Sequence, residues 1–175
     1  KVVLLGDVKH VFGKILGQER NEISKLFSFL KKKCDKIIIV KGNHDAVLEP
    51  LARAENVKVV DYLLAGKNRE FCFLHGERDF PEIYEKKIKY WIMGHAHPAV
   101  KLSDGVKTEK FKCFFVGNFK GKKIIIVPSF FEGNVGSDPR ENELGLAWDF
   151  NLNKFRVKVV GEDLEIYDFG KLGKL

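Results

Sequence analysis

The segment Lys36–Asp45, which reads Lys-Ile-Ile-Ile-Val-Lys-Gly-Asn-His-Asp, decides the fold. A short run of β-branched apolar residues with charge at both ends is typical of a strand that is buried on both faces. The run stops at Gly42, and the three side chains that follow can coordinate a metal or exchange protons. The segment therefore predicts a central strand that carries functional groups at its carboxyl end.

Three other segments repeat this plan of an apolar run followed by a polar tip: Val2–Asp7, Phe71–Gly76 and Tyr90–His97. In an open α/β sheet, ligands bind outside the carboxyl ends of the strands, so the four tips should converge on one crevice. Every histidine of the chain lies in or close to such a tip: His10, His44, His75, His95 and His97. This grouping favours a metal or catalytic site over scattered structural histidines.

Length and composition indicate a soluble globular protein. The 175 residues suit a single domain over 1–175, and 45% of them are hydrophobic. No apolar run is long enough to span a bilayer, and no signal-peptide pattern is present, so we expect a cytoplasmic protein without a membrane partner. Cys34, Cys72 and Cys113 lack CxxC spacing, so we expect neither a disulfide framework nor a thiolate zinc site.

The chain is basic, with a formal net charge of +7. Clustered lysine and arginine supply affinity for phosphate groups, so this charge suits polyanionic partners. The lysines are nevertheless dispersed over predicted helix ends and turns, where solvated faces account for most of them. A dedicated nucleic-acid groove therefore remains an alternative at this point.

The first part of the chain alternates helices and strands. Apolar spacing predicts a helix over Glu19–Lys33 that crosses from the first strand to the central one, after a loop over Gly6–Gly17. The other elements that we expect here are a helix over Ala46–Ala54 with Pro50 near its start or at a kink, a strand over Val57–Leu64 and a helix over Pro81–Lys89.

Beyond Pro98 the pattern changes to short strands joined by turns, which is typical of antiparallel sheet. The predicted strands are Lys112–Val116, Lys123–Val127, Leu146–Phe150 and Phe155–Val160. Pro128–Glu143 is rich in glycine, proline and small polar residues, which predicts a long surface loop; loops of this length are often functional. The whole pattern predicts an α/β fold of two sheets packed face to face, with helices outside.

The polar tips supply metal ligands of one chemical type. They offer a carboxylate, an amide oxygen and three imidazoles, from Asp7, Asn43, His75, His95 and His97. This mixture suits divalent Mn, Fe, Zn, Co or Ni. A carboxylate has two oxygens, which makes Asp7 the natural shared ligand of a binuclear centre. Two ions about 3.5 to 4 Å apart would supply hydroxide at neutral pH for an in-line displacement at phosphorus.

These motifs, taken together and in order, resemble the calcineurin-like metallophosphoesterase superfamily. The matching motifs, all at strand ends, are Gly6-Asp7, Gly42-Asn43-His44-Asp45, His75-Gly76 and Gly94-His95-Ala96-His97. The match is closest to small prokaryotic, especially archaeal, phosphoesterases, whose variants look like Gly6–His10 and Gly94–Pro98. It covers about the first hundred residues of the chain.

The resemblance implies a four-layer α-β-β-α sandwich of two mixed sheets, and hydrolysis of phosphate esters by a hydroxide that bridges two divalent ions, with Mn preferred. Asp7 would bridge the ions. One site would be completed by Asn43, His75 and His95, and the other would include His97. His44 would act on the phosphate or the leaving group as an acid or charge stabiliser, with Asp45 orienting its ring.

The chain departs from the family pattern at its start. The family's first motif, Asp-x-His on the first strand, is not found, and because Lys1 lies inside a strand we expect a preceding segment to carry it. Without that segment, one metal site would hold only Asp7 and His97. A histidine that some relatives carry after Gly76 is also lacking, so Glu77 or Arg78 is expected to face the substrate.

The sequence thus predicts a metal-dependent phosphoesterase. Phosphodiester or nucleotide substrates are favoured because the basic charge suits polyanions. His10 either lines the substrate pocket or closes the loop after Asp7. The alternatives are a nuclease subunit that acts on DNA or RNA in a larger assembly, and a catalytically inactive scaffold of the same fold. A homodimer is compatible with the sequence.

Overall fold

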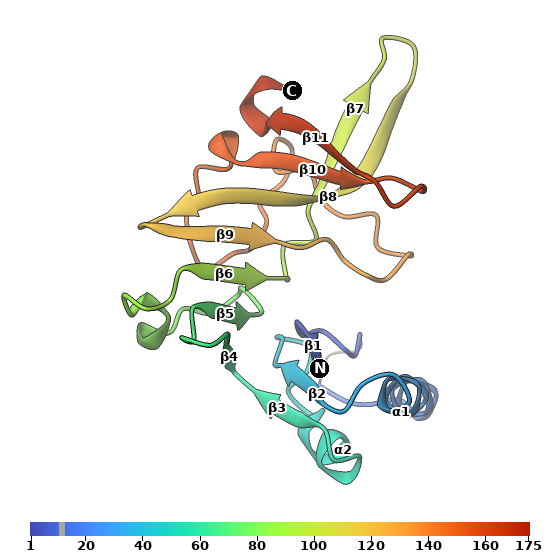
Figure 1. The fold of residues 1–175 in the computed structure, drawn as a ribbon. Coiled ribbons are helices and arrows are strands. Elements are labelled where there is room, and N and C mark those ends of the chain that lie inside the picture. Colours follow the sequence, from blue (N-terminus) through green and yellow to red (C-terminus); the bar gives the residue numbers. More distant parts are fainter. Residues whose placement is uncertain (11–12) are drawn as a thin grey trace.

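The computed structural model describes residues 1–10 and 13–175, which form two β-sheets (Figure 1). The small sheet of this described chain has three parallel strands in the order β1-β2-β3: β1 (Val2–Leu4), β2 (Ile37–Val40) and β3 (Lys58–Val60). All residues of β2 are buried, which confirms the predicted central strand. Of the loop predicted over Gly6–Gly17, Val11 and Phe12 lie outside the described residues.

Two α-helices pack with the small sheet: α1 (Gly17–Lys31) and α2 (Glu49–Ala54). Ile23 and Phe27 of α1 are buried in one cluster with Ile39 of β2 and Leu51 of α2. Pro50 lies in the first turn of α2, where its missing N–H deprives no carbonyl of a partner. The helix predicted over Ala46–Ala54 is therefore present in shortened form, and both helices bury their apolar sides against this sheet.

The large sheet is mixed, and in the described chain it has eight strands. Their order is β11-β10-β8-β9-β6-β5-β4, with β7 paired to β8. The strands are β4 (Tyr62–Ala65), β5 (Phe71–Leu74), β6 (Tyr90–Met93), β7 (Ala99–Ser103), β8 (Thr108–Phe119), β9 (Lys122–Ile126), β10 (Arg156–Val160) and β11 (Ile166–Lys171). β5, β6 and β9 run parallel to one another, and the β7–β8 hairpin projects from the body (Figure 1).

The core of the large sheet is aromatic. Trp91 is fully buried and lies against Trp148, with ring centroids 5.2 Å apart. Its indole N–H donates to the carbonyl of Ile83 at 3.1 Å, and that of Trp148 donates to the Tyr84 hydroxyl at 2.9 Å. Short 3₁₀ helices border this core: η1 (Pro81–Tyr84), η2 (Leu152–Lys154) and η3 (Leu172–Lys174).

The strand predicted over Val57–Leu64 is in fact two strands in different sheets. The carbonyl of Val60 accepts a hydrogen bond from Lys41 at the end of the small sheet, whereas Tyr62 pairs with Leu74 in the large one. Asp61 is thus the single residue between β3 and β4. The chain crosses between sheets without a glycine or proline to mark the change.

Two other predicted elements differ from the structure. The helix expected over Pro81–Lys89 is only the short turn η1, and in the residues that follow the carbonyls of Glu85 and Ile88 accept from the ammonium of Lys122 on β9. The strand expected over Leu146–Phe150 is irregular. Its alternating burial arises because Trp148 and Phe150 fill the aromatic core.

The layer order implied by the resemblance is only partly matched. The small sheet is parallel rather than mixed. Both α-helices of the described chain pack with this sheet, so a helical layer over the large sheet stays a prediction. Across the described residues, no helix combines the length and the apolar character that a membrane span requires.

Candidate metal centre

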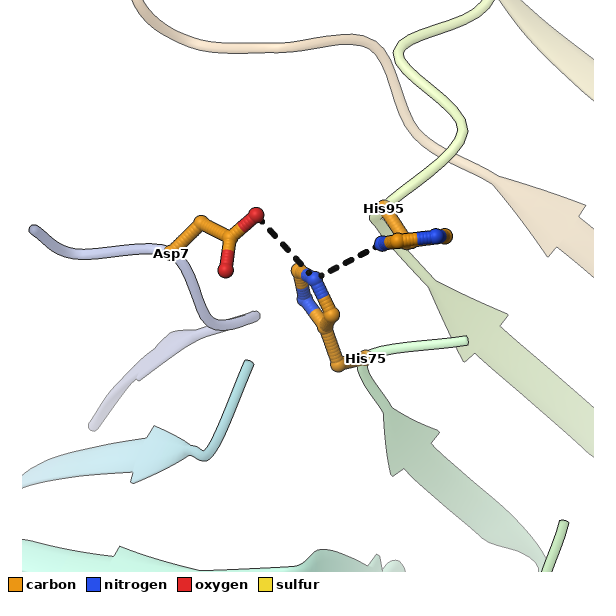
Figure 2. A group of neighbouring side chains, drawn as sticks. All are labelled: Asp7, His75 and His95. Atoms are coloured by element: carbon orange, nitrogen blue, oxygen red, sulfur yellow. Dashed lines mark hydrogen bonds and ion pairs between the residues drawn. The ribbon is translucent and has the colours of Figure 1, made fainter. Parts of the chain in front are cut away.

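Three predicted ligands converge where strands of both sheets end. Asp7 follows β1 of the small sheet, and His75 and His95 follow β5 and β6 of the large sheet. Their side chains point toward one another (Figure 2). One ligand atom from each lies within 4.8 Å of the others. The predicted convergence of strand tips therefore produces a compact group of one carboxylate and two imidazoles.

His75 is oriented by the main chain of the other sheet. Its ring is buried, and Nδ1 lies 2.5 Å from the carbonyl oxygen of Leu5. Because a carbonyl can only accept, Nδ1 carries the proton and Nε2 faces the group. Nε2 lies 3.3 Å from Oδ2 of Asp7 and 3.2 Å from Nδ1 of His95. A backbone carbonyl that fixes the far nitrogen is the usual support of a metal-binding imidazole.

Two glycines allow the tips to approach this closely. A Cβ atom on Gly6 would collide with the His75 ring and with the backbone of Gly42. A Cβ atom on Gly42 would collide with the carboxylate and backbone of Asp7. The glycines of the Gly6-Asp7 and Gly42-Asn43 pairs are therefore required by packing between strand ends.

Three of the candidate residues have left-handed backbone conformations. The φ angles are 51° at Asp7, 60° at His95 and 43° at His97. For residues with a Cβ atom such conformations cost on the order of 1 kcal/mol each or more, and they are found where the surrounding structure enforces them. At Asp7 and His95 the turns direct the side chains toward His75 (Figure 2).

His44 lies beside the group of three rather than within it. Its Nδ1 donates to the carbonyl of His10 at 2.6 Å, and the two rings stack with centroids 6.1 Å apart. This leaves Nε2 of His44 turned toward Oδ2 of Asp7, 4.0 Å away. The backbone N–H of His44 also donates to Asp7. His10 therefore borders the site, and its carbonyl orients the His44 ring.

Asp45 has a different role from the expected one. It was predicted to orient the ring of His44, but the carbonyl of His10 does so. The carboxylate of Asp45 is fully buried and accepts from the backbone N–H groups of Gly42 at 3.0 Å and Lys9 at 3.3 Å. Lys9, which sequence reasoning did not single out, is also buried, and its ammonium donates to the carbonyl of His44. Together they brace the tips of β1 and β2 against each other.

Asn43 and His97 stand apart from the group. Asn43 is exposed, and among the described residues no hydrogen bond joins its side chain to the three ligands. His97 is half-buried, and the side-chain amide of Asn134 donates to its Nδ1. The Asn134 oxygen accepts from the N–H of Gly136 at 2.9 Å, which fixes the end of the amide that faces the ring. In this arrangement the neutral His97 ring carries its proton on Nε2.

Sequence reasoning missed Asn134. It lies in the predicted Pro128–Glu143 loop, which packs beside the candidate site. The N–H of Ser137 donates to the carbonyl of His97 at 2.8 Å, and Ser137 bridges with Pro98. The length and polar composition of the loop were the only signals, and neither singles out one asparagine.

Arg78 lies outside the group of three. Its guanidinium pairs with Asp61 at 2.9 Å and with Glu77 at 3.3 Å, and it covers the ring of Phe80. The side chain is about half exposed. Contact of Arg78 with a substrate stays a prediction, and these ion pairs would have to rearrange for the guanidinium to clamp a phosphate.

The surroundings shift the pKa values of the three residues in different directions. Burial opposes ionisation of Asp7, but the hydrogen bond and charge of His75 hold its pKa below the usual value. Burial would lower the pKa of His75, whereas the bonds to Asp7 and Leu5 raise it. Burial and the nearby His75 lower the pKa of His95, which favours a neutral ring. Asp7 and His95 are thus biased toward the carboxylate and the neutral imidazole that bind metals, whereas His75 would have to give up its Nε2 proton when a cation binds.

The donor set fits one divalent cation. One oxygen and two ring nitrogens face one another from buried or partly buried positions. Mn, Fe, Zn, Co and Ni all accept this combination of ligands.

Comparisons with known proteins extend the fold assignment. No protein-family model matches the sequence, and no curated protein matches it. The solved structure of nuclease MPE from Pseudomonas putida matches with a TM-score of 0.62 and 17% identity, over 95% of this chain and 70% of that chain.

Two structures of Vps29 from Entamoeba histolytica, a single mutant and the wild type complexed with Zn²⁺, have TM-scores of 0.38 and 0.33 at 14% and 13% identity. They cover 96% of this chain and 98% of their own, but the similarity is too low to support an argument. The likeness to nuclease MPE shows that the two chains share a fold.

Proposed function

We propose that this protein is a metal-dependent phosphoesterase that acts on phosphodiester or nucleotide substrates. One observation carries the proposal: Asp7, His75 and His95 converge from the strand tips of two sheets, in a fold shared with a nuclease. The net charge of +7 supports a polyanionic substrate. Hydrolysis of a phosphate ester is the chemistry that this ligand set suits best.

The proposed cofactor is a divalent cation, with Mn preferred and Fe, Zn, Co or Ni as alternatives. Asp7, His75 and His95 would hold it, and when bound it would polarise the phosphate and lower the pKa of bound water. A second cation is a further part of the proposal. It would need Asp7 and His97 as ligands, together with a change at the Asn134–His97 contact, whereas Asn43 would join His75 and His95 at the first cation.

Other residues of the chain would transfer a proton, position the site and contact the substrate. Nε2 of His44 is turned toward Asp7, and we assign it the transfer of a proton to the leaving oxygen or the stabilisation of charge on the phosphate. The carbonyl of His10 holds that ring in position. Asp45 keeps the two strand tips together, and His10 and Arg78 are the proposed substrate contacts.

Hydrolysis of small model substrates tests the proposal directly. Full-length protein is stripped with a chelator, and turnover of bis-p-nitrophenyl phosphate and p-nitrophenyl phosphate is measured before and after Mn is restored. Manganese-dependent turnover would support the proposal, and the ratio of the two rates would separate a diesterase from a monoesterase. Absence of turnover with every divalent metal would favour the inactive scaffold.

A nuclease subunit that works within a larger assembly is the second candidate, and the likeness to nuclease MPE favours it. Salt-dependent binding to DNA or RNA, followed by metal-dependent cleavage, would distinguish it from an enzyme for small nucleotides. A cytoplasmic location and a homodimer remain predictions. Size measurement in solution tests the latter.

A further inference from the structure

The loop that follows β9 presents two phenylalanines to solvent. The relative exposure of Phe130 is 102% and that of Phe131 is 67%. The loop leaves β9 on the side from which the β7–β8 hairpin projects (Figure 1). Single exposed apolar residues are common on protein surfaces, but two adjacent aromatic rings at this exposure form an apolar patch, which often marks a binding site.

The exposure of Phe130 is fixed by the neighbouring strand. The ammonium of Lys112 on β8 donates to the carbonyls of Ser129 at 3.1 Å and Phe131 at 2.5 Å, which lie on either side of Phe130. The N–H of Phe131 also donates to the Ser129 hydroxyl. These bonds hold the backbone on both sides of Phe130, whose side chain is fully exposed. The ring of Phe131 lies against Gly133, where a Cβ atom would collide with it.

The same loop reaches the candidate metal centre. Asn134, three residues after Phe131, donates to the ring of His97. The platform, defined here as residues 129–134, is therefore tethered at one end to Lys112 and at the other to His97. The loop that carries the phenylalanines thus also contacts His97, one of the predicted ligands.

The charge around the platform suits a polyanion. Lys112 lies beneath it, and the ammonium of Lys110 is 3.4 Å from the carbonyl of Gly136, just beyond it. Within the platform Glu132 is the single acidic residue. Aromatic rings flanked by lysines are the combination with which proteins bind single-stranded nucleic acid, because every base has a face that can stack.

We propose that Phe130 and Phe131 form a base-stacking platform for single-stranded nucleic acid, which leads the phosphodiester backbone toward the candidate metal centre. The proposal rests on the proposed phosphoesterase function and specifies its substrate as an unpaired strand. A duplex keeps its base faces stacked internally, so the platform should discriminate against it.

Binding measured in the presence of a chelator tests the platform apart from any cleavage. A fluorescein-labelled oligothymidylate is titrated with wild-type protein and variants, and its fluorescence anisotropy is followed. Phe130→Ala should weaken binding by roughly fivefold or more, the loss expected from removing one stacked base. Phe130→Trp should retain wild-type affinity, and Phe130→Leu should bind as weakly as the alanine variant. Leu164→Ala, at an apolar position that is 82% exposed on the β10–β11 turn, is the matched control and should bind normally.

Several results would overturn the platform. These are wild-type affinity in Phe130→Ala, wild-type affinity in Phe130→Leu, or equally tight and Phe130-dependent binding of duplex DNA. Binding of phosphatidylserine vesicles that Phe130→Leu preserves, with no binding of the oligothymidylate, would identify a lipid surface instead. Turnover of bis-p-nitrophenyl phosphate by wild-type protein decides the phosphoesterase proposal separately, because that substrate has no base to stack.

Discussion

The ring of His75, which follows β5 of the large sheet, donates its Nδ1 proton to the carbonyl of Leu5, which follows β1 of the small sheet and lies two residues before Asp7. One hydrogen bond thus joins the two sheets and fixes the ring nitrogen that faces Asp7. When the two sheets pack together, the bond to Leu5 therefore also turns Nε2 of His75 toward Asp7.

Replacement of His75 by alanine should therefore reduce both metal affinity and stability. The variant lacks a ligand atom and a buried hydrogen bond, so Mn affinity should fall by at least about tenfold and unfolding free energy by about 1 kcal/mol or more. Calorimetric titration with Mn and urea denaturation measure the two effects. His10→Ala, which removes an exposed ring outside the group, should retain the affinity; unchanged affinity in His75→Ala would remove it from the ligand set.

Replacement of His44 by alanine should separate metal binding from turnover. His44 lies beside the ligand group with Nε2 directed toward Asp7, so its loss should leave Mn affinity near wild type and reduce turnover by roughly 10² to 10⁴. Asp7→Ala, in contrast, should lose bound metal and activity together. Metal analysis and bis-p-nitrophenyl phosphate hydrolysis on the same samples provide the comparison. Wild-type turnover in His44→Ala would show that its assigned role is wrong.

Replacement of Asn134 by aspartate should change the protonation of His97. Burial lowers the pKa of His97 in the native protein, where the Asn134 amide donates to Nδ1. A carboxylate there would instead accept a proton from Nδ1 and stabilise the charged ring, which raises the pKa of His97. An NMR titration of the histidine resonances measures the shift. Asn142→Asp, at an exposed position in the same loop, is the control; an unchanged His97 titration would contradict the contact.

Asp138 should make the fold sensitive to acid. It is buried and accepts from Arg140 at 2.7 Å and from the N–H of Lys101 at 2.8 Å. Burial raises its pKa, but these donors outweigh that effect and hold the pKa below the unfolded value near 3.8. Its contribution to stability is therefore present above that value and lost as pH falls through the lower folded-state pKa.

Asp138→Asn should accordingly cost about 1 to 3 kcal/mol of unfolding free energy near neutral pH. The difference from wild type should shrink as pH falls from neutral to a value below 3.8, toward the lower pKa of the folded-state carboxylate. Urea denaturation at both pH values provides the measurement. Asp149→Asn, at an exposed position, should stay within about 0.5 kcal/mol of wild type. A difference that is the same at both pH values would argue against the charge as the cause.

The strands that carry the candidate site could be predicted because their signal is local. Ile37–Val40 is a continuous apolar run, and it forms a fully buried strand. Phe71–Leu74 and Tyr90–Met93 were predicted with the same bounds as β5 and β6. Ligands generally bind at the carboxyl ends of strands, and this rule then predicted that Asp7, His75 and His95 would lie close together.

The features that could not be predicted depend on contacts between distant segments. Asp61 resembles any charged residue within a strand, and only the pairing of its neighbours shows that the chain changes sheets there. Trp148 and Phe150 alternate with polar positions as a strand would, but the aromatic core accounts for that spacing. Asn134 reaches His97 through the path of a long loop, for which a single sequence contains no pattern.

The left-handed conformations of Asp7, His95 and His97 place stability and chemistry in conflict. Glycine adopts such conformations freely, so substitution by glycine would relieve backbone strain at each position while it removes the functional side chain. A screen that selects variants for thermal resistance alone should therefore accept glycine at His95 and recover proteins that resist heat but bind metal more weakly. Directed evolution of this protein for robustness needs a selection for metal binding at every round.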